Sequence, residues 1–114
     1  TVSTALESAG ISCLSLPEKD GRLDLAALLS ELADREINEV QVEAGATLNG
    51  TLLTAGLIDE ILLYQAPVLL GDQAAGPFTF GPLEAMAESP HLELLETMRF
   101  GDDLRIRLQP REGC

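Results

Sequence analysis

The passage from strand to helix at residues 38–56, NEVQVEAGATLNGTLLTAG, restricts the fold more than any other feature of the chain. Residues 38–44 predict a strand, and residues 46–56 predict a helix that stops at Gly56. An acidic residue, Glu43, stands where the strand meets the turn. In parallel α/β sheets, ligands bind beyond the carboxyl ends of strands, so this junction is the first place to look for a site.

Other parts of the chain alternate in the same way. Residues 25–37 carry apolar side chains at helical spacing after Asp24, an N-cap residue, and predict a helix. Residues 58–71, IDEILLYQAPVLLG, contain a continuous apolar run, which predicts a strand covered on both faces and central in its sheet. We also expect the last turns of a helix ending at Gly10, and a strand at residues 11–17.

The C-terminal part differs in kind. Residues 71–90 are rich in Gly, Ala and Pro and are expected to be mostly loop, with one helical turn at PLEAMAE. Residues 91–100 and 104–110 alternate around GDD, which predicts an antiparallel hairpin with one wet face. The expected order is β-α-β-α-β followed by this hairpin, an α/β fold around one core.

The charge balance excludes some partners. Nineteen acidic and seven basic residues give a net charge of −12, which repels nucleic acid and anionic membrane surfaces. Arg105 and Arg107 form a local basic segment, interpreted as a solvated strand face or, alternatively, an anion contact. No apolar run could span a bilayer and no signal peptide is visible, so a cytoplasmic protein is expected. Cys13 and Cys114 are expected to be reduced, with Cys13 in the core.

Conventional catalytic clusters are missing from the sequence. His91 has no Cys or carboxylate at ligand spacing, so no metal site is expected and a structural or exposed role is favoured. No G-x-S-x-G, G-x-G-x-x-G or P-loop motif occurs. Two interpretations of the turn at Glu43 remain open: a strand end or helix cap with glycines that serve packing, or a turn that holds a phosphate at the helix N-terminus.

Residues 37–71 resemble the C-terminal reductase domain of the bifunctional riboflavin-biosynthesis deaminase/reductase. The resemblance rests on VEAGATL, on GLIDE about ten residues later and on the turn APVLLG, in that order. The upstream segment DGRLDLAALLSELADREI and the closing strand pair also fit, so nearly the whole chain is covered. Val68 departs from the pattern, because the family often has Lys there.

The resemblance implies a dihydrofolate-reductase-like fold, a three-layer α/β/α domain with a mixed sheet, of which residues 1–114 form the C-terminal part. It implies NADPH-dependent reduction of 5-amino-6-(5-phosphoribosylamino)uracil to its ribityl form, and a homodimer. Glu43 would contact the substrate, while no catalytic residue is assigned. The NADP phosphates would be lined by Gly45, Ala46, Thr47, Leu48, Asn49, Gly50 and Thr51.

The resemblance also sets limits. It covers only the C-terminal half of the reductase domain, and the P-C-x-x-C motif of a zinc deaminase does not occur. We therefore expect turnover only within a longer polypeptide, and none from these residues alone. Two alternatives stay open: a non-catalytic association module whose apolar strands pair between chains, and a reductase of the same fold acting on another pterin- or pyrimidine-like substrate.

Overall fold

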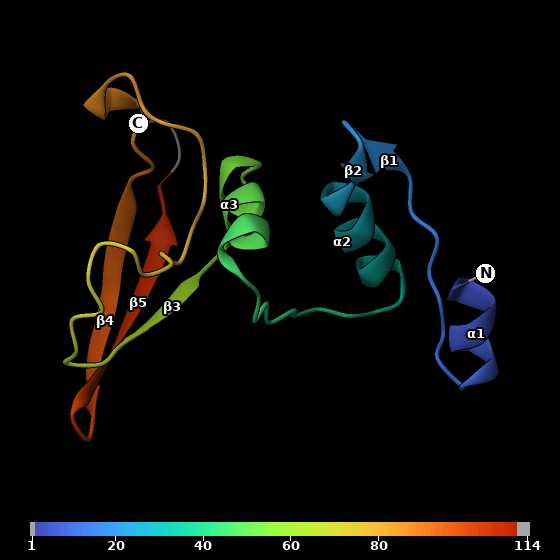
Figure 1. Ribbon diagram of the computed structural model, residues 1–114, viewed down its shortest axis with the longest axis horizontal. Helices are drawn as coiled ribbons and strands as arrows, with labels where there is room; N and C mark the ends of the chain where they lie inside the picture. The colour runs from blue at the N-terminus through green and yellow to red at the C-terminus, as the bar shows by residue number, and fades with distance from the viewer. Residues whose placement is uncertain (1, 112–114) are drawn as a thin grey trace. The chain divides into compact units, whose positions relative to one another are not determined.

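The computed structural model describes residues 2–111 and divides the chain into two compact units, residues 1–41 and 42–114. Each unit combines helical and strand elements (Figure 1). The prediction for Cys114 lies outside the described residues. The first unit contains α1 (Val2–Ser8), β1 (Glu18–Lys19), β2 (Arg22–Leu23) and α2 (Leu25–Asp34); the second contains α3 (Ala46–Thr54), β3 (Ile61–Gln65), the 3-10 turn η1 (Met86–Glu88), β4 (Leu92–Phe100) and β5 (Asp103–Pro110).

In the first unit, local sequence signals determine where the elements begin. The Asp24 carboxylate accepts a hydrogen bond from the Ala27 N–H at 3.1 Å, so it caps α2 as the sequence predicts. The strands β1 and β2 pair antiparallel around Asp20 and Gly21. Both of these residues have positive φ, 53° and 77°, as a type I′ turn requires.

The three α-helices of the described chain end in one arrangement, the Schellman motif, which satisfies carbonyl groups of the last turn. The predicted terminators Gly10 and Gly56 take left-handed φ values of 85° and 70°. In α2 the same position is taken by Glu36, with φ 64°. The N–H that follows donates to the carbonyl five residues earlier at 3.0 Å in each case: Ile11 to Leu6, Ile37 to Leu32, and Leu57 to Leu52.

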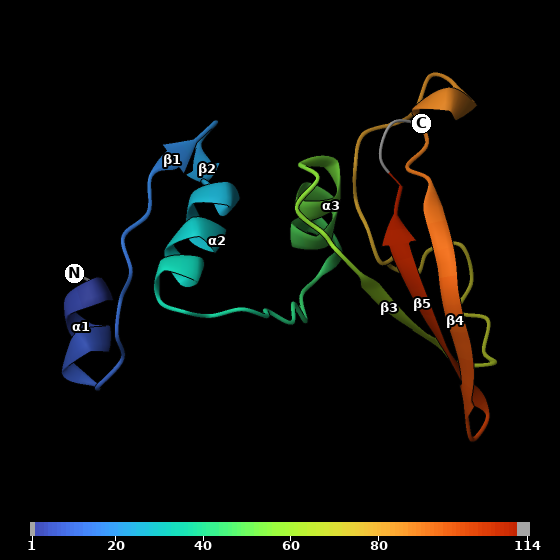
Figure 2. The ribbon, with the colours of Figure 1, turned by 180° about the vertical axis from the view of Figure 1, so that it is seen from behind.

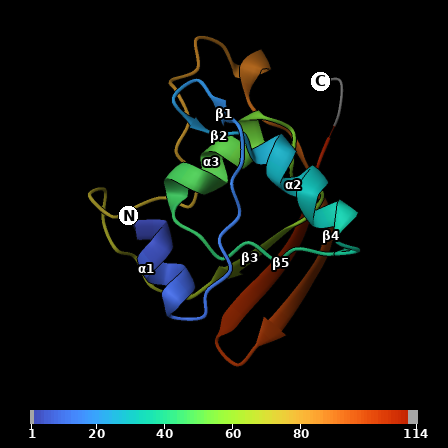
Figure 3. The same ribbon diagram turned by 90° about the vertical axis from the view of Figure 1, so that its right-hand side faces the viewer.

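The second unit is organised around a three-stranded antiparallel sheet in which β5 lies between β3 and β4 (Figure 2). The predicted hairpin is confirmed, because β4 and β5 pair along their length and Phe100 stands opposite Asp103 (Figure 3). Gly101 opens the two-residue turn with a φ of 58°, as a type II′ turn requires. The register shifts between Leu94 and Glu96, so Leu95 forms a bulge.

Few side chains of the described residues are buried. Leu52 of α3 is 7% exposed and Ile61 of β3 is 9% exposed.

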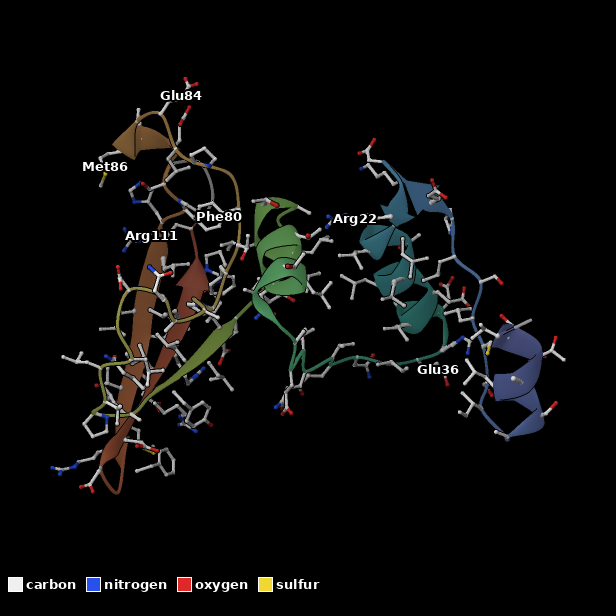
Figure 4. The ribbon with its side chains drawn as sticks, in the orientation of Figure 1. Arg22, Glu36, Phe80, Glu84, Met86 and Arg111 are labelled. Carbon is white, nitrogen blue, oxygen red and sulfur yellow. The ribbon has the colours of Figure 1, made fainter. Side chains whose placement is uncertain are left out.

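The predicted helical turn in the loop is confirmed as η1, where the Glu88 carboxylate accepts from the N–H groups of Glu84 and Ala85 at 2.7 and 3.2 Å. Glu84 and Met86 project away from this turn (Figure 4).

Four sequence predictions about strands and core are wrong for the described residues. The segments 11–17 and 38–44 form no strand, and Val40 and Val42 are each about half exposed. The β3 strand lies at an edge of its sheet, not at the centre, and Tyr64 is 61% exposed. A strand forms by pairing with another strand, and among residues 2–111 no strand pairs with these segments. Cys13, expected in the core, is exposed.

The α/β fold class itself is confirmed, because helices and sheet combine as the sequence predicts and the order α3, β3, β4, β5 is retained. The pairing within the three-stranded sheet is antiparallel throughout. The parallel part of the predicted mixed sheet required strands at 11–17 and 38–44, which do not form among residues 2–111.

Candidate functional site

The candidate site is the turn that leads into α3. Gly45 is the N-cap of this nine-residue helix, with φ −77° and ψ 173°, and as a glycine it provides no side-chain cap. The first N–H groups of a helix have no partner inside the helix, and they carry its partial positive charge. A Cβ atom placed on Gly45 would meet no atom within 4 Å, so the space beside the turn is open.

Glu43 lies two residues before Gly45 and is exposed, as is Thr47 in the first turn of α3. Ala46 is half-buried and Leu48 is 39% exposed. The chain thus brings a carboxylate, an open helix terminus and a threonine together within five residues. Such a terminus suits a phosphate, while the carboxylate suits hydroxyl or N–H groups of a neutral ligand part.

The second half of the predicted cofactor segment makes contacts within the chain. The Asn49 side-chain amide donates to the carbonyls of Ala44 and Pro77, each at 3.1 Å. The Thr51 hydroxyl donates to the Thr47 carbonyl at 3.0 Å. Gly50 is buried, and the backbone of Thr79 occupies the space that a side chain at residue 50 would need. The seven predicted residues therefore divide into an open part and a part bonded to the chain itself.

Sequence reasoning missed the segment 77–79, which packs on α3. The Thr79 N–H donates to the Ala46 carbonyl at 2.9 Å, in addition to its contact with Gly50. One signal could have indicated this contact. A glycine in a helix interior costs about 1 kcal/mol relative to alanine, so Gly50 suggested a close backbone approach.

The basic side chains of the C-terminal strand form ion pairs with carboxylates of neighbouring segments. Arg107 forms ion pairs with Glu60 at 2.8 Å and with Glu96 at 3.4 Å, and Arg105 pairs with Glu96 at 3.0 Å. The hydrogen bond from Arg107 lowers the pKa of the Glu60 carboxyl and raises the pKa of Arg107 itself. The Arg105 guanidinium also lies 5.2 Å from the centre of the Phe100 ring. Each of the two guanidinium groups is thus paired with a carboxylate.

A cleft lies away from the candidate turn. It is a cleft of about 860 Å³ between the end of α3 and the ends of β4 and β5, and its lining includes Gly56, Asp59, His91 and Arg111. None of the predicted site residues lines it. His91 is exposed, which is one of the two roles expected for it, and its backbone carbonyl accepts from the Arg111 N–H at 2.8 Å. No group of residues suited to a metal ion occurs in the described chain.

The fold and the site define a mixed α/β protein in which an acidic residue is followed by the glycine N-cap of a helix. The profile of the RibD C-terminal domain matches residues 2–106, and the chain belongs to this family. Riboflavin biosynthesis protein RibD of Escherichia coli is 43% identical over 98 residues, covering 86% of this chain and 27% of that protein. The 5-amino-6-(5-phosphoribosylamino)uracil reductase of Buchnera aphidicola is 35% identical over 97 residues, covering 83% and 47%.

Solved structures agree with the fold. Form 2 of RibD from Acinetobacter baumannii superposes with a TM-score of 0.83 at 35% identity, covering 95% of this chain and 29% of that one. The chain therefore spans between about a quarter and a half of the length of these relatives. Across residues 2–111, no helix has the length and apolar character needed to cross a bilayer.

Proposed function

We propose that this chain carries the cofactor-binding part of an NADPH-dependent pyrimidine reductase of riboflavin biosynthesis, active within a longer polypeptide and in the cytoplasm. The reaction is the reduction of 5-amino-6-(5-phosphoribosylamino)uracil to its ribityl form. Membership of the RibD C-terminal domain family and the name of the Buchnera aphidicola relative support this activity. The observation that carries the proposal is the glycine N-cap of α3, which has open space beside it and lies two residues after Glu43.

The residues at this turn fit a nicotinamide cofactor. The open side of Gly45 leaves room for a phosphate close to the backbone, and the helix terminus favours its negative charge. NADPH supplies the hydride when bound, and the chain supplies orientation and electrostatics. Gly45, Ala46, Thr47 and Leu48 would hold the phosphates directly, with Asn49, Gly50 and Thr51 behind them.

Glu43 is proposed to accept hydrogen bonds from the sugar or the pyrimidine of the substrate. In the polypeptide that contains these residues, Glu43→Gln should lower kcat/KM by about 10- to 100-fold, the worth of a charged hydrogen bond. The measurement is the loss of reduced-nicotinamide absorbance with the pyrimidine substrate. Glu39→Gln is the matched control, because Glu39 is also exposed and lies four residues earlier.

Two results would contradict this assignment in different ways. Unchanged kcat/KM in Glu43→Gln would remove Glu43 from the substrate site while leaving the reductase activity intact. No binding of NADPH by the unaltered polypeptide would remove the cofactor from the proposal.

We further propose that the protein is a homodimer. The turn after β3 presents Val68, Leu69 and Leu70 at 63%, 99% and 79% exposure, and Tyr64 of β3 is also exposed. An apolar surface beside an open strand edge favours association. Light scattering should give twice the chain mass, and Leu69→Lys should shift the protein toward the monomer. A monomer that still binds NADPH would overturn the dimer, and with it the alternative of a pure association module.

A further inference from the structure

The segment 77–79 is fastened to the beginning of α3 at three points. The Asn49 amide donates to the Pro77 carbonyl at 3.1 Å, and the Thr79 N–H donates to the Ala46 carbonyl at 2.9 Å. Between these two bonds, the Thr79 backbone rests on Gly50, where any side chain would collide with it. Two segments about 30 residues apart in sequence are thereby held as one piece beside the candidate site.

The Asn49 side chain connects α3 to two other segments, at Ala44 and at Pro77. A side-chain amide nitrogen carries two hydrogens, and here one goes to Ala44 before the turn and the other to Pro77 in the loop. The helix position of Asn49 is fixed in turn by its own N–H, which donates to the Gly45 carbonyl at 3.2 Å. Both acceptors of the side chain are carbonyl oxygens, so its nitrogen has to face them. Its donors are therefore already used within the chain.

We propose that Asn49 is a positioning residue for the cofactor and not a direct phosphate ligand. The Asn49 amide fixes the residues on both sides of Gly45, so that the N–H groups at the start of α3 keep one orientation. It also fixes residues 77–79 as a wall behind that turn. This inference rests on the proposed function, because the ligand that benefits from a fixed turn is the phosphate part of NADPH.

Preorganisation explains why this bond matters for binding. A flexible turn has to be ordered when the ligand binds, and that cost appears as weaker affinity. Removing the amide leaves two backbone carbonyls without their donor, which should raise the KM for NADPH on the order of tenfold. The kcat should stay close to its original value, and the KM for the pyrimidine should rise less than the KM for NADPH, because Asn49 is linked to the substrate side only through Ala44, the neighbour of Glu43.

The experiment compares Asn49→Ala with the unaltered polypeptide that contains these residues. Hydrogen exchange followed by mass spectrometry reports the mobility of residues 77–79, and steady-state kinetics reports the two KM values and kcat. We expect faster exchange in this segment together with the higher KM for NADPH. Asn38→Ala is the matched control, because the other asparagine of the chain is exposed and lies outside the turn.

A second variant protects the test against misfolding of the first. Thr79→Pro removes the N–H that donates to Ala46 and leaves the Asn49 side chain in place. A positioning role requires Thr79→Pro to raise exchange and the KM for NADPH in the same direction as Asn49→Ala. If Asn49 contacts the phosphate directly, Asn49→Ala raises the KM for NADPH without the faster exchange at residues 77–79 that Thr79→Pro produces.

Three outcomes would overturn the proposal. In the first, Asn49→Ala raises the KM for NADPH without faster exchange at 77–79, as a direct ligand would. In the second, exchange rises while every kinetic constant is unchanged, which leaves a purely structural bond. In the third, the unaltered polypeptide does not bind NADPH; the proposed function then fails, and the exchange data still show separately whether Asn49 holds the loop.

Discussion

The helices α2 and α3 begin in opposite ways. The Asp24 carboxylate closes the start of α2, where it accepts from the Ala27 N–H at 3.1 Å. The start of α3 is formed by Gly45, which provides no side-chain cap and has open space beside it. Both residues are ordinary N-cap types, and glycine costs only about a few tenths of a kcal/mol relative to a capping side chain.

This difference shows how a helix start can remain available to a ligand at little cost in stability. An aspartate cap satisfies a backbone donor and adds a negative charge, so it competes with an incoming phosphate. A glycine N-cap leaves the backbone N–H donors and the space beside them available to a ligand. In α3 the order that a cap would supply comes instead from Asn49 and from the backbone of residues 77–79, which hold the helix from behind.

The largest expected effect comes from disturbing that support. In Gly50→Ala the new methyl group meets the Thr79 backbone, which cannot rotate aside as a flexible side chain could. Overpacking of this kind costs about 3 kcal/mol at its upper end, and the better helix propensity of alanine returns about 1 kcal/mol. We expect the free energy of unfolding to fall by about 2 kcal/mol, measured by denaturant titration.

Gly76→Ala is the control for this change. Gly76 lies in the same loop, has no positive φ, and a Cβ atom there would meet nothing within 4 Å. The free energy of unfolding of Gly76→Ala should stay within about 0.5 kcal/mol of that of the unaltered protein. Equal stability of both variants would mean that residues 77–79 do not rest on α3 in solution.

A smaller effect is expected from giving α3 the cap of α2. Gly45→Asp should change stability by only about a few tenths of a kcal/mol, because the new carboxylate would accept from the helix N–H groups. It would also place a negative charge where the phosphate is proposed to bind. We expect the Kd for NADPH to rise about tenfold, or about 1.4 kcal/mol, measured by titration of cofactor fluorescence.

The reciprocal change, Asp24→Gly, completes the comparison. It removes a cap from α2 at a similarly small cost in stability, and it should leave the Kd for NADPH unchanged. If Gly45→Asp binds NADPH as well as the original protein does, the start of α3 is not the phosphate site. Both helix starts would then be equivalent, and the absence of a cap at Gly45 would have no functional meaning.

Local features of this chain could be predicted well from its sequence. The helices around Leu28 and Leu52, the cap at Asp24 and the hairpin turn at Gly101 follow from side-chain spacing and from backbone preferences of single residues. The family motif also identified the turn at Glu43 as the place to examine. Each of these features depends on residues only a few positions apart, so the local sequence is sufficient to predict it.

Predictions that depended on distant neighbours succeeded less often. The apolar pattern of residues 38–44 predicted a strand, and that of Ile61 to Tyr64 predicted a central one, yet the first forms no strand and the second lies at an edge. An apolar alternating pattern shows that a segment can pair. It does not show which segment pairs with it, because register and partner depend on residues far away in sequence.

The sequence alone determined where α2 and α3 begin, the hairpin, and the turn at Gly45 that follows Glu43, because each follows from conformational preferences that a residue carries with it. Only the tertiary structure decided that Asn49 and Gly50 face the loop at 77–79 and that Arg107 pairs with Glu60. Those contacts join residues 28 to 47 positions apart. Hydrogen bonds and close packing act across space, and no periodicity in the sequence records them.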